Sequence, residues 1–221
     1  MAVLFFGDIM KERNAFDQSL QYISYKDRTE YEVRKYLEQK EYREQVIEEV
    51  LTKLKYYHYI DDAKYLNNYY QANQTGKAYG RIRVLQDLKN KRLDKTCLNQ
   101  FYQLFTIENE QKCIHKQMQK VILKYQKLPV RKRKEKIKAF LMRKGFEFEV
   151  INGALELFKA DIEEENVETI NEALEKDFQH YYALQSRKGY QGWELKERLK
   201  RNLYGKGYSF EQIKAILDQK T

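Results

Sequence analysis

The feature that most constrains the fold of this chain is a short pattern that occurs four times. Each copy has an amphipathic segment, a two-residue break that begins with lysine, and a second amphipathic segment. In the third copy, residues 137–143 precede the break at Lys144–Gly145, and residues 146–155 follow it. The apolar residues of both segments are three and four residues apart, which is the spacing of a buried helix face. Gly145 stands where a helix end requires a left-handed residue, a conformation that glycine adopts without a Cβ penalty.

Aligned positions keep their apolar character in all four copies, although the residues between them vary freely. The residues directly after the break are Tyr42, Leu93, Phe146 and Tyr208. The helix before the break has Val33, Val84, Ile137 and Leu199 at one position, and Leu37, Leu88, Leu141 and Leu203 four residues later. The helix after the break has Ile47, Leu98, Ile151 and Ile213. Such self-similarity is typical of a repeat architecture.

One more amphipathic segment precedes each pair, over roughly residues 15–25, 62–75, 107–126 and 167–186. Each repeat is therefore predicted to contain three helices, and the single proline and nine glycines argue against an all-β fold. A repeat of about fifty residues cannot bury much of its own apolar face, so neighbouring repeats must stack. We expect an all-α fold of four tandem three-helix repeats that form an elongated, curved array. The expected domains are an N-terminal segment over residues 1–14, which match no repeat position, and repeats at residues 15–60, 61–106, 107–160 and 161–221.

Local signals place several helix ends and one loop. Thr29 with Glu32, and Ser209 with Gln212, have the spacing of a capping box, in which a hydroxyl and a carboxyl or amide group satisfy backbone amides at a helix start. Residues 76–80, Gly-Lys-Ala-Tyr-Gly, are the clearest predicted loop.

The charges of the chain are unevenly distributed. The net charge is +9 and the pI is about 9.2, a modest excess that suits a polyanionic partner without requiring one. Residues 127–138 contain seven basic residues and one glutamate, whereas residues 161–175 contain seven acidic residues and no basic one. So dense a run of like charges repels itself unless a partner covers it.

Basic residues on three predicted helices are candidates for contact with phosphate or with an acidic protein surface. For any single residue the alternative is a solvated helix face. The candidates are Arg81, Arg83, Lys89, Lys91, Arg92, Arg131, Lys132, Arg133, Lys134, Lys136, Lys138, Arg198, Lys200 and Arg201.

The aromatic residues are numerous, with 19 Tyr, 11 Phe and one Trp. Tyrosines such as Tyr56, Tyr57 and Tyr59 can stack on bases, but aromatics at helical spacing more often pack in a core. We expect these tyrosines to be packing residues whose hydroxyl groups stay in contact with water. Trp193, near a glycine-bounded helix start, is the better candidate for an exposed contact, but we expect it to lie at the edge of the core.

No pattern in the sequence indicates catalysis, a cofactor or a metal. His58, His115 and His180 have no second ligand at metal-binding spacing. The glycines at residues 76–80 and 205–207 lack the preceding strand that phosphate- and dinucleotide-binding loops require. We expect no catalytic, cofactor-binding or metal-ligating residue.

The cysteines and the N-terminal apolar run bear on location. Cys97 aligns with Val46 and Val150, which predicts a small buried residue, and two cysteines suit a reducing compartment. The apolar run at residues 2–6 is too short to span a membrane. We expect a cytoplasmic protein with no membrane contact.

Three segments resemble the characteristic segments of the RecX family of regulatory proteins: residues 28–37, RTEYEVRKYL; residues 59–62, YIDD; and residues 80–91, GRIRVLQDLKNK. The resemblance covers about residues 15–217. Two features depart from it, because Gly80–Arg81 stands where the family usually has Gly-Pro, and the breaks at Lys40–Glu41 and Lys91–Arg92 lack the family's glycine.

The resemblance implies a non-enzymatic modulator of the RecA recombinase. Such proteins bind in the groove of the RecA–DNA filament and limit recombination, ATP hydrolysis and coprotease activity, which links them to DNA repair, homologous recombination and the SOS response. The implied partners are RecA and, weakly when alone, single- and double-stranded DNA, and the implied state is a monomer. On this interpretation the fourteen basic candidates contact RecA or DNA.

Two other functions remain open on the sequence. Tandem units with tight inter-helix turns also fit a stand-alone DNA-binding protein of helix-turn-helix-like units, which would bind duplex DNA tightly without RecA. A peptide-binding scaffold of the HEAT or armadillo type would show no RecA effect and weak salt dependence.

Overall fold

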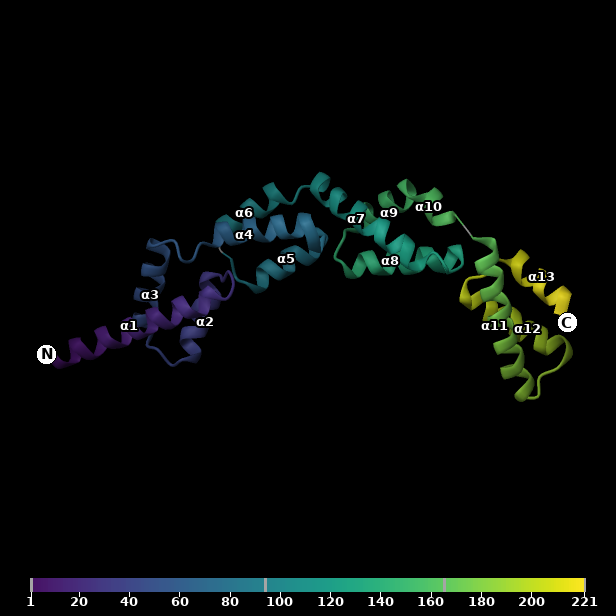
Figure 1. Cartoon of the computed structure of the whole chain (residues 1–221), viewed down its shortest axis with the longest axis horizontal. Coiled ribbons are helices and arrows are strands. Elements are labelled where there is room, and N and C mark those ends of the chain that lie inside the picture. The colour runs from purple at the N-terminus through teal and green to yellow at the C-terminus, as the bar shows by residue number, and fades with distance from the viewer. Residues whose placement is uncertain (1, 94, 165, 221) are drawn as a thin grey trace. The chain divides into compact units, whose positions relative to one another are not determined.

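The computed structural model describes residues 2–93, 95–164 and 166–220, with side chains described from residue 12 onward except that of Lys95 (Figure 1). Every regular element in these ranges is a helix, which confirms the predicted all-α class. None of the described helices is long and apolar enough to cross a membrane.

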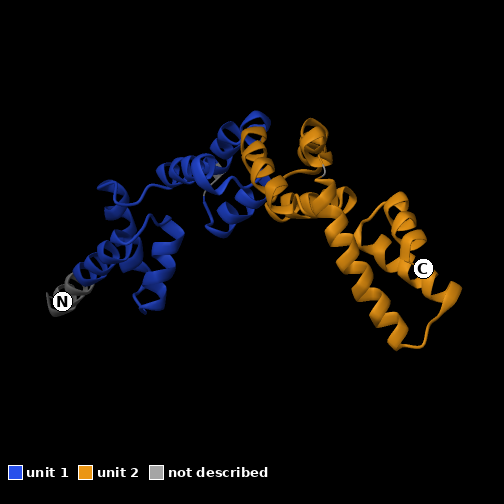
Figure 2. Ribbon diagram, turned by 45° about the vertical axis from the view of Figure 1, so that its right-hand side comes forward, with its two compact units in different colours: residues 1–110 blue, residues 111–221 orange. Residues whose placement is uncertain are grey.

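The chain divides into two compact units, residues 1–110 and 111–221, with the boundary inside helix α7 (Figure 2). The first unit contains α1 (Ala2–Ser24), α2 (Glu30–Gln39), α3 (Glu44–Tyr56), α4 (Asp62–Ala72), the π-helical turn η1 (Asn73–Lys77), α5 (Arg81–Asn90), α6 (Lys95–Leu104) and the start of α7 (Ile107–Tyr125). The second contains the rest of α7, then α8 (Val130–Arg143), α9 (Phe148–Leu157), α10 (Lys159–Glu163), α11 (Val167–Arg187), α12 (Gly192–Lys206) and α13 (Phe210–Lys220).

Separate apolar cores hold successive groups of three helices together, as the repeat pattern predicts. The core of α1–α3 includes Val33, Leu37, Ile47 and Leu51. The core of α4–α6 includes Val84, Leu88, Leu93 and Phe101. The core of α11–α13 includes Leu199, Leu203, Ile213 and Leu217. Most of the aligned apolar positions therefore lie on the inner faces of the helices, as their spacing predicts. Leu98 is an exception: it is half-buried and lies outside the core of α4–α6, where Cys97 and Phe101 are buried instead. The repeat boundaries at residues 60, 106 and 160 stay predictions.

The first helix extends beyond the repeat pattern. Residues 2–14, predicted as a separate segment, continue α1 without interruption, while the side chains of residues 2–11 lie outside the described residues. Helix α10 was not predicted, and it follows α9 after a single residue, Phe158.

All four breaks have a residue with positive φ at the same aligned position. The angles are 59° at Glu41, 49° at Arg92, 81° at Gly145 and 104° at Gly207. After two of these residues the next amide returns to the preceding helix, from Tyr42 N to Leu37 O and from Phe146 N to Leu141 O, each at 3.3 Å. The left-handed end predicted for Gly145 is confirmed, and the first two repeats adopt it without glycine.

The predicted capping boxes are present, whereas the predicted loop is shorter than expected. Thr29 accepts a hydrogen bond from Glu32 N while Glu32 accepts from Thr29 N, and Ser209 and Gln212 make the same exchange. The π-helical turn carries the chain through Lys77, so that only residues 78–80 are irregular. Buried Asn73 stabilises this end by donating to Tyr79 O at 3.0 Å and accepting from Tyr79 N at 2.9 Å.

Several aromatic residues lie further outside than predicted. Trp193 is 78% exposed, so its placement at the core edge is wrong. Tyr56, Tyr57 and Tyr59 are each more than half exposed, so they are not core residues. They pack mainly on one another, with ring centroids of Tyr56 and Tyr57 5.1 Å apart. Cys97 is buried, as predicted.

Glycine at the first break should stabilise the fold. We expect Glu41→Gly to raise the free energy of unfolding by about 0.5–1 kcal/mol, because it removes the Cβ penalty of the left-handed conformation. The matched change Gly145→Ala should lower it by about 1 kcal/mol for the same reason. Urea unfolding followed by circular dichroism measures both, and a Glu41→Gly variant less stable than the parent would contradict this account.

Candidate interaction surfaces

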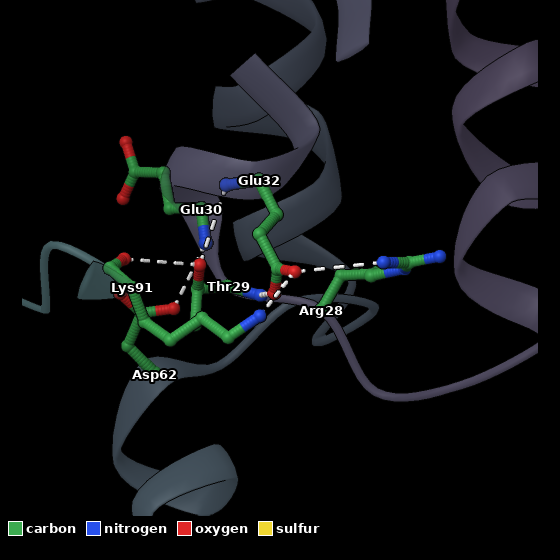
Figure 3. A network of polar contacts seen from close by, with 6 residues as sticks. All are labelled: Arg28, Thr29, Glu30, Glu32, Asp62 and Lys91. Atoms are coloured by element: carbon green, nitrogen blue, oxygen red, sulfur yellow. Dashed lines mark hydrogen bonds and ion pairs between the residues drawn. The ribbon is translucent and has the colours of Figure 1, made fainter. Parts of the chain in front are cut away.

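A network of polar side chains joins the start of α2 to α4 and to the end of α5 (Figure 3). The Thr29 hydroxyl, which caps α2, also donates to Lys91 O at 3.2 Å. The Lys91 ammonium lies 2.5 Å from Glu32 Oε1, and Arg28 pairs with the same oxygen at 3.5 Å. The Glu30 amide donates to Asp62 Oδ1 at 2.9 Å. The first two groups of three helices are therefore tied together by buried or half-buried hydrogen bonds rather than by apolar contact alone.

The environment of Glu32 favours its charged form. Burial raises the pKa of Glu32, but hydrogen bonds from Lys91 and from the Thr29 amide, with the charges of Lys91 and Arg28, lower that pKa below its usual value of 4.5. Lys91, predicted as a partner contact, is thus already committed to a carboxylate of its own chain.

The other candidates of this region lie at both ends of α5. Arg81 begins the helix, and its backbone amide donates to Glu110 Oε1 at 2.9 Å. Arg83 pairs with Asp87 at 3.4 Å and lies 5.2 Å from the centroid of the Tyr79 ring. Lys89 and Arg92 are exposed, and the Arg92 guanidinium lies 4.7 Å from the Tyr31 ring centroid.

Arg92 and Tyr31 line a groove of about 630 Å³ within the first unit. Its charged lining includes the basic residues Arg34 and Lys55 and the acidic residues Asp61 and Asp62. Because the lining carries both positive and negative side chains, its charge alone does not indicate a site for an anion.

Arg133, in the middle of the basic run, is completely buried. Its guanidinium donates to the carbonyl oxygens of Gln126 at 2.6 Å, Leu128 at 3.1 Å, Ile162 at 2.5 Å and Glu164 at 2.8 Å. These carbonyls lie at the C-terminal ends of α7 and α10, where helices leave acceptors without a partner in the helix. The prediction that Arg133 contacts RecA or DNA is therefore corrected: the side chain is a structural link between α7, α8 and α10, with no exposed surface to offer a partner.

The remaining candidates on α8 reach the surface. Lys132 pairs with Glu135 at 2.8 Å, and Lys134 with Glu163 at 2.6 Å. Lys136 is exposed. The Lys138 ammonium lies 4.4 Å from the Phe148 ring centroid. The Arg131 guanidinium lies 3.7 Å from the centroid of the Tyr204 ring. The acidic segment that follows α9 thus neutralises part of the basic run, through Glu163.

The candidates on α12 are surface residues with nearby carboxylates. Arg198 pairs with Glu194 at 3.1 Å and lies 3.5 Å from the Tyr190 ring centroid, and Lys200 pairs with Glu197 at 2.7 Å. Arg201 is exposed. Exposed pairs one helical turn apart contribute only about 0.3–0.5 kcal/mol each, so both basic groups can be transferred to a partner at little cost.

Within the described residues, no group of three His, Cys, Asp or Glu side chains is placed to hold a metal ion. The geometry defines a class of protein, one built from three-helix repeats with basic residues on α5, α8 and α12.

The family models place the chain within that class. The model for the first three-helix domain of RecX matches residues 15–54, and the model for the third three-helix domain of RecX matches residues 108–155 and again residues 163–217. The chain belongs to the RecX family.

Individual relatives agree. The regulatory protein RecX of Streptococcus mutans is 36% identical over 200 residues, which are 90% of this chain and 75% of the relative. That of Bacillus licheniformis is 32% identical over 216 residues, 97% of this chain and 79% of the relative. Both relatives are named as regulatory proteins rather than as enzymes.

Solved structures share the fold. A crystal structure of regulatory protein RecX is similar with a TM-score of 0.60 at 26% identity, over 72% of this chain and 76% of that one. RecX of Lactobacillus salivarius is similar in fold with a TM-score of 0.59 at 23% identity, over 67% of this chain and 97% of that one.

The buried position of Arg133 predicts a large effect on stability. We expect Arg133→Ala to lower the free energy of unfolding by about 3 kcal/mol or more, because four carbonyl oxygens lose their donor. Arg133→Lys should retain only part of the lost stability, since one ammonium cannot reproduce the planar guanidinium geometry. Lys136→Ala on the same helix is the control and should change stability by less than about 0.5 kcal/mol. Equal stability of the Arg133 and Lys136 alanine variants would rule out the structural role.

The Glu32 network predicts a dependence of stability on pH. A carboxyl whose pKa is lower in the folded state stabilises the fold above its unfolded pKa, and this contribution is lost as the pH falls through the folded value. The chain should therefore lose stability below about pH 4.5, and Glu32→Gln should reduce that loss. Urea midpoints at pH 7 and pH 3.5 test this, with the exposed residue change Glu38→Gln as control. An identical pH dependence in the parent and Glu32→Gln chains would show that the network contributes nothing.

Proposed function

We propose that this protein binds the RecA–DNA filament and inhibits the recombinase, ATPase and coprotease activities of RecA, and so modulates DNA recombination and repair without chemistry of its own. The observation that carries the proposal is membership of the RecX family over most of the chain, with relatives named as regulatory proteins. The basic residues on α5, α8 and α12 support it, because both DNA and an acidic protein surface attract them.

The proposed contact set is smaller than the sequence suggested. Arg133 is excluded by its burial, and Lys91 would have to leave Glu32 before it could reach a partner. The remaining proposed contacts for RecA or DNA are Arg81, Arg83, Lys89, Arg92, Arg131, Lys132, Lys134, Lys136, Lys138, Arg198, Lys200 and Arg201.

The first test is the rate of ATP hydrolysis by RecA on single-stranded DNA while this protein is titrated in. We expect inhibition well below one molecule per RecA, because a protein that binds along or at the end of a filament affects many subunits. Unchanged hydrolysis at an excess of this protein and at low salt would overturn the proposal. Tight binding to duplex DNA without RecA would instead favour the stand-alone DNA-binding function, which the helix pairs also permit.

Charge reversal on α8 tests the contact set without disturbing the core. We expect Lys134→Glu, Lys136→Glu and Lys138→Glu together to raise the concentration for half-inhibition at least tenfold, because three favourable charges become unfavourable. The same number of reversals at dispersed exposed lysines, Lys26→Glu, Lys120→Glu and Lys188→Glu, is the control for net charge. Circular dichroism verifies that both variants are folded. Equal inhibition by the two variants would remove α8 from the contact set.

A further inference from the structure

The last group of three helices carries an open groove between α12 and α13. Ile213 and Leu217 line its base and belong to the buried core. Phe210, 71% exposed, and Tyr204, 46% exposed, form an aromatic wall with ring centroids 5.5 Å apart. The volume is about 600 Å³, a size that accepts several ligand side chains.

Three lysines flank this groove: Lys196 and Lys200 on α12 and Lys214 on α13. In the described part of the chain, neither Lys196 nor Lys214 has an ion-pair partner. Lys200 pairs with Glu197 on its own helix, but both side chains keep 40% or more of their exposure. Such an exposed pair one helical turn apart contributes little to stability, so a ligand carboxylate can replace it.

The first repeat covers the equivalent positions with carboxylates of its own chain. In the repeat alignment, Lys200, Phe210 and Lys214 correspond to Arg34, Glu44 and Glu48. There the Arg34 guanidinium donates to Glu44 at 2.6 Å and to Glu48 at 2.5 Å, so that carboxylates of α3 cover the basic residue of α2. The last repeat has an aromatic residue and a lysine in place of both carboxylates. The groove of the last repeat therefore has the basic residue on α12 but no carboxylates on α13 at the positions that pair with it in the first repeat.

We propose that this groove binds an acidic peptide segment with an aliphatic or aromatic anchor. The anchor packs against the exposed faces of Phe210 and Tyr204 and over Ile213, while carboxylates of the peptide lie on Lys196, Lys200 and Lys214. The peptide thus supplies from outside the carboxylates that Glu44 and Glu48 supply within the first repeat.

The groove suits a peptide better than a nucleic acid. Glu211 and Asp218 also line it, and they repel a strand that carries a phosphate at every nucleotide. A peptide can place its few carboxylates beside the lysines and neutral residues beside Glu211 and Asp218. The buried apolar base offers nothing to a phosphate but stabilises an apolar anchor by removing it from water.

The test is direct binding in the absence of RecA. The probe is a fluorescein-labelled, glutamate-rich peptide with phenylalanine and leucine one helical turn apart, titrated with the full chain and followed by fluorescence anisotropy. We expect saturable one-to-one binding that weakens as salt rises, because the lysines and the peptide attract by screened charge. A peptide with lysine in place of every glutamate should not bind.

Two variants separate charge from the anchor. Phe210→Glu with Lys214→Glu copies the first repeat, and the new carboxylates should cover Lys200 and weaken binding at least tenfold. Phe210→Ser leaves every charge in place and should also weaken binding severalfold through loss of the anchor contact. The control for net charge is Lys120→Glu with Lys188→Ala, two exposed positions outside the groove, which should bind as the parent does.

Three results would overturn the proposal: no saturable binding by the parent chain, equal binding by the copied-repeat variant, or displacement of the peptide by a thymidine oligonucleotide that binds more tightly. The last would assign the groove to nucleic acid. This inference does not rest on the proposed function. A chain that binds the peptide but leaves RecA hydrolysis unchanged would refute only the filament proposal, and a chain that inhibits RecA without binding the peptide would refute only this one.

Discussion

The fold depends on a left-handed backbone conformation that recurs at the break between the second and third helices of each repeat. A residue with positive φ ends the second helix, and the next residue turns inward to the core that the helix has just left. Where that residue is Gly145 or Gly207, the conformation carries no steric penalty. Glu41 and Arg92 adopt it as well, so the contacts of the folded chain outweigh a local penalty of about 1 kcal/mol at each of these residues.

Polar groups then decide how neighbouring helices are joined. Helix ends expose carbonyl oxygens and amides that must find partners when they are covered. Arg133 satisfies four such carbonyls, and the Thr29 network satisfies both a helix start and the end of the following repeat's helix. These contacts use charged or hydroxyl side chains in positions where an apolar residue would leave backbone groups unpaired. They complement the apolar cores, which hold each repeat but do not orient its ends.

The repeat spacing predicted the helices and their buried faces because apolar periodicity follows directly from helix geometry. It was less informative for polar residues. Arg133 was predicted as a surface charge, yet it stands four residues before Ile137 and eight before Leu141, on the buried face of α8. The helical spacing from Ile137 and Leu141 could have identified Arg133 as buried, but the many neighbouring basic residues suggested a surface position instead. The prediction for Trp193 was wrong in the opposite direction, since it placed an exposed side chain at the edge of the core. Trp193 lies outside the series Leu195, Leu199 and Leu203 that faces the core.

The surfaces were harder to predict than the fold. Whether a lysine is available depends on carboxylates distant in sequence, such as Glu32 for Lys91 or Glu163 for Lys134. The groove between α12 and α13 lacks two carboxylates that the first repeat has. The sequence alignment shows this difference, but its meaning depends on the ion pairs of Arg34, which only the structure reveals.

The Thr29 hydroxyl also affects how the first unit unfolds. In repeat proteins, the strength of coupling between neighbours determines whether repeats melt singly or together. Here one oxygen accepts from the first turn of α2 and donates to Lys91 O, so fraying of that turn also releases the end of α5. The amides at these two helix ends, which are far apart in sequence, should consequently exchange with solvent in the same opening event, as one cooperative unit.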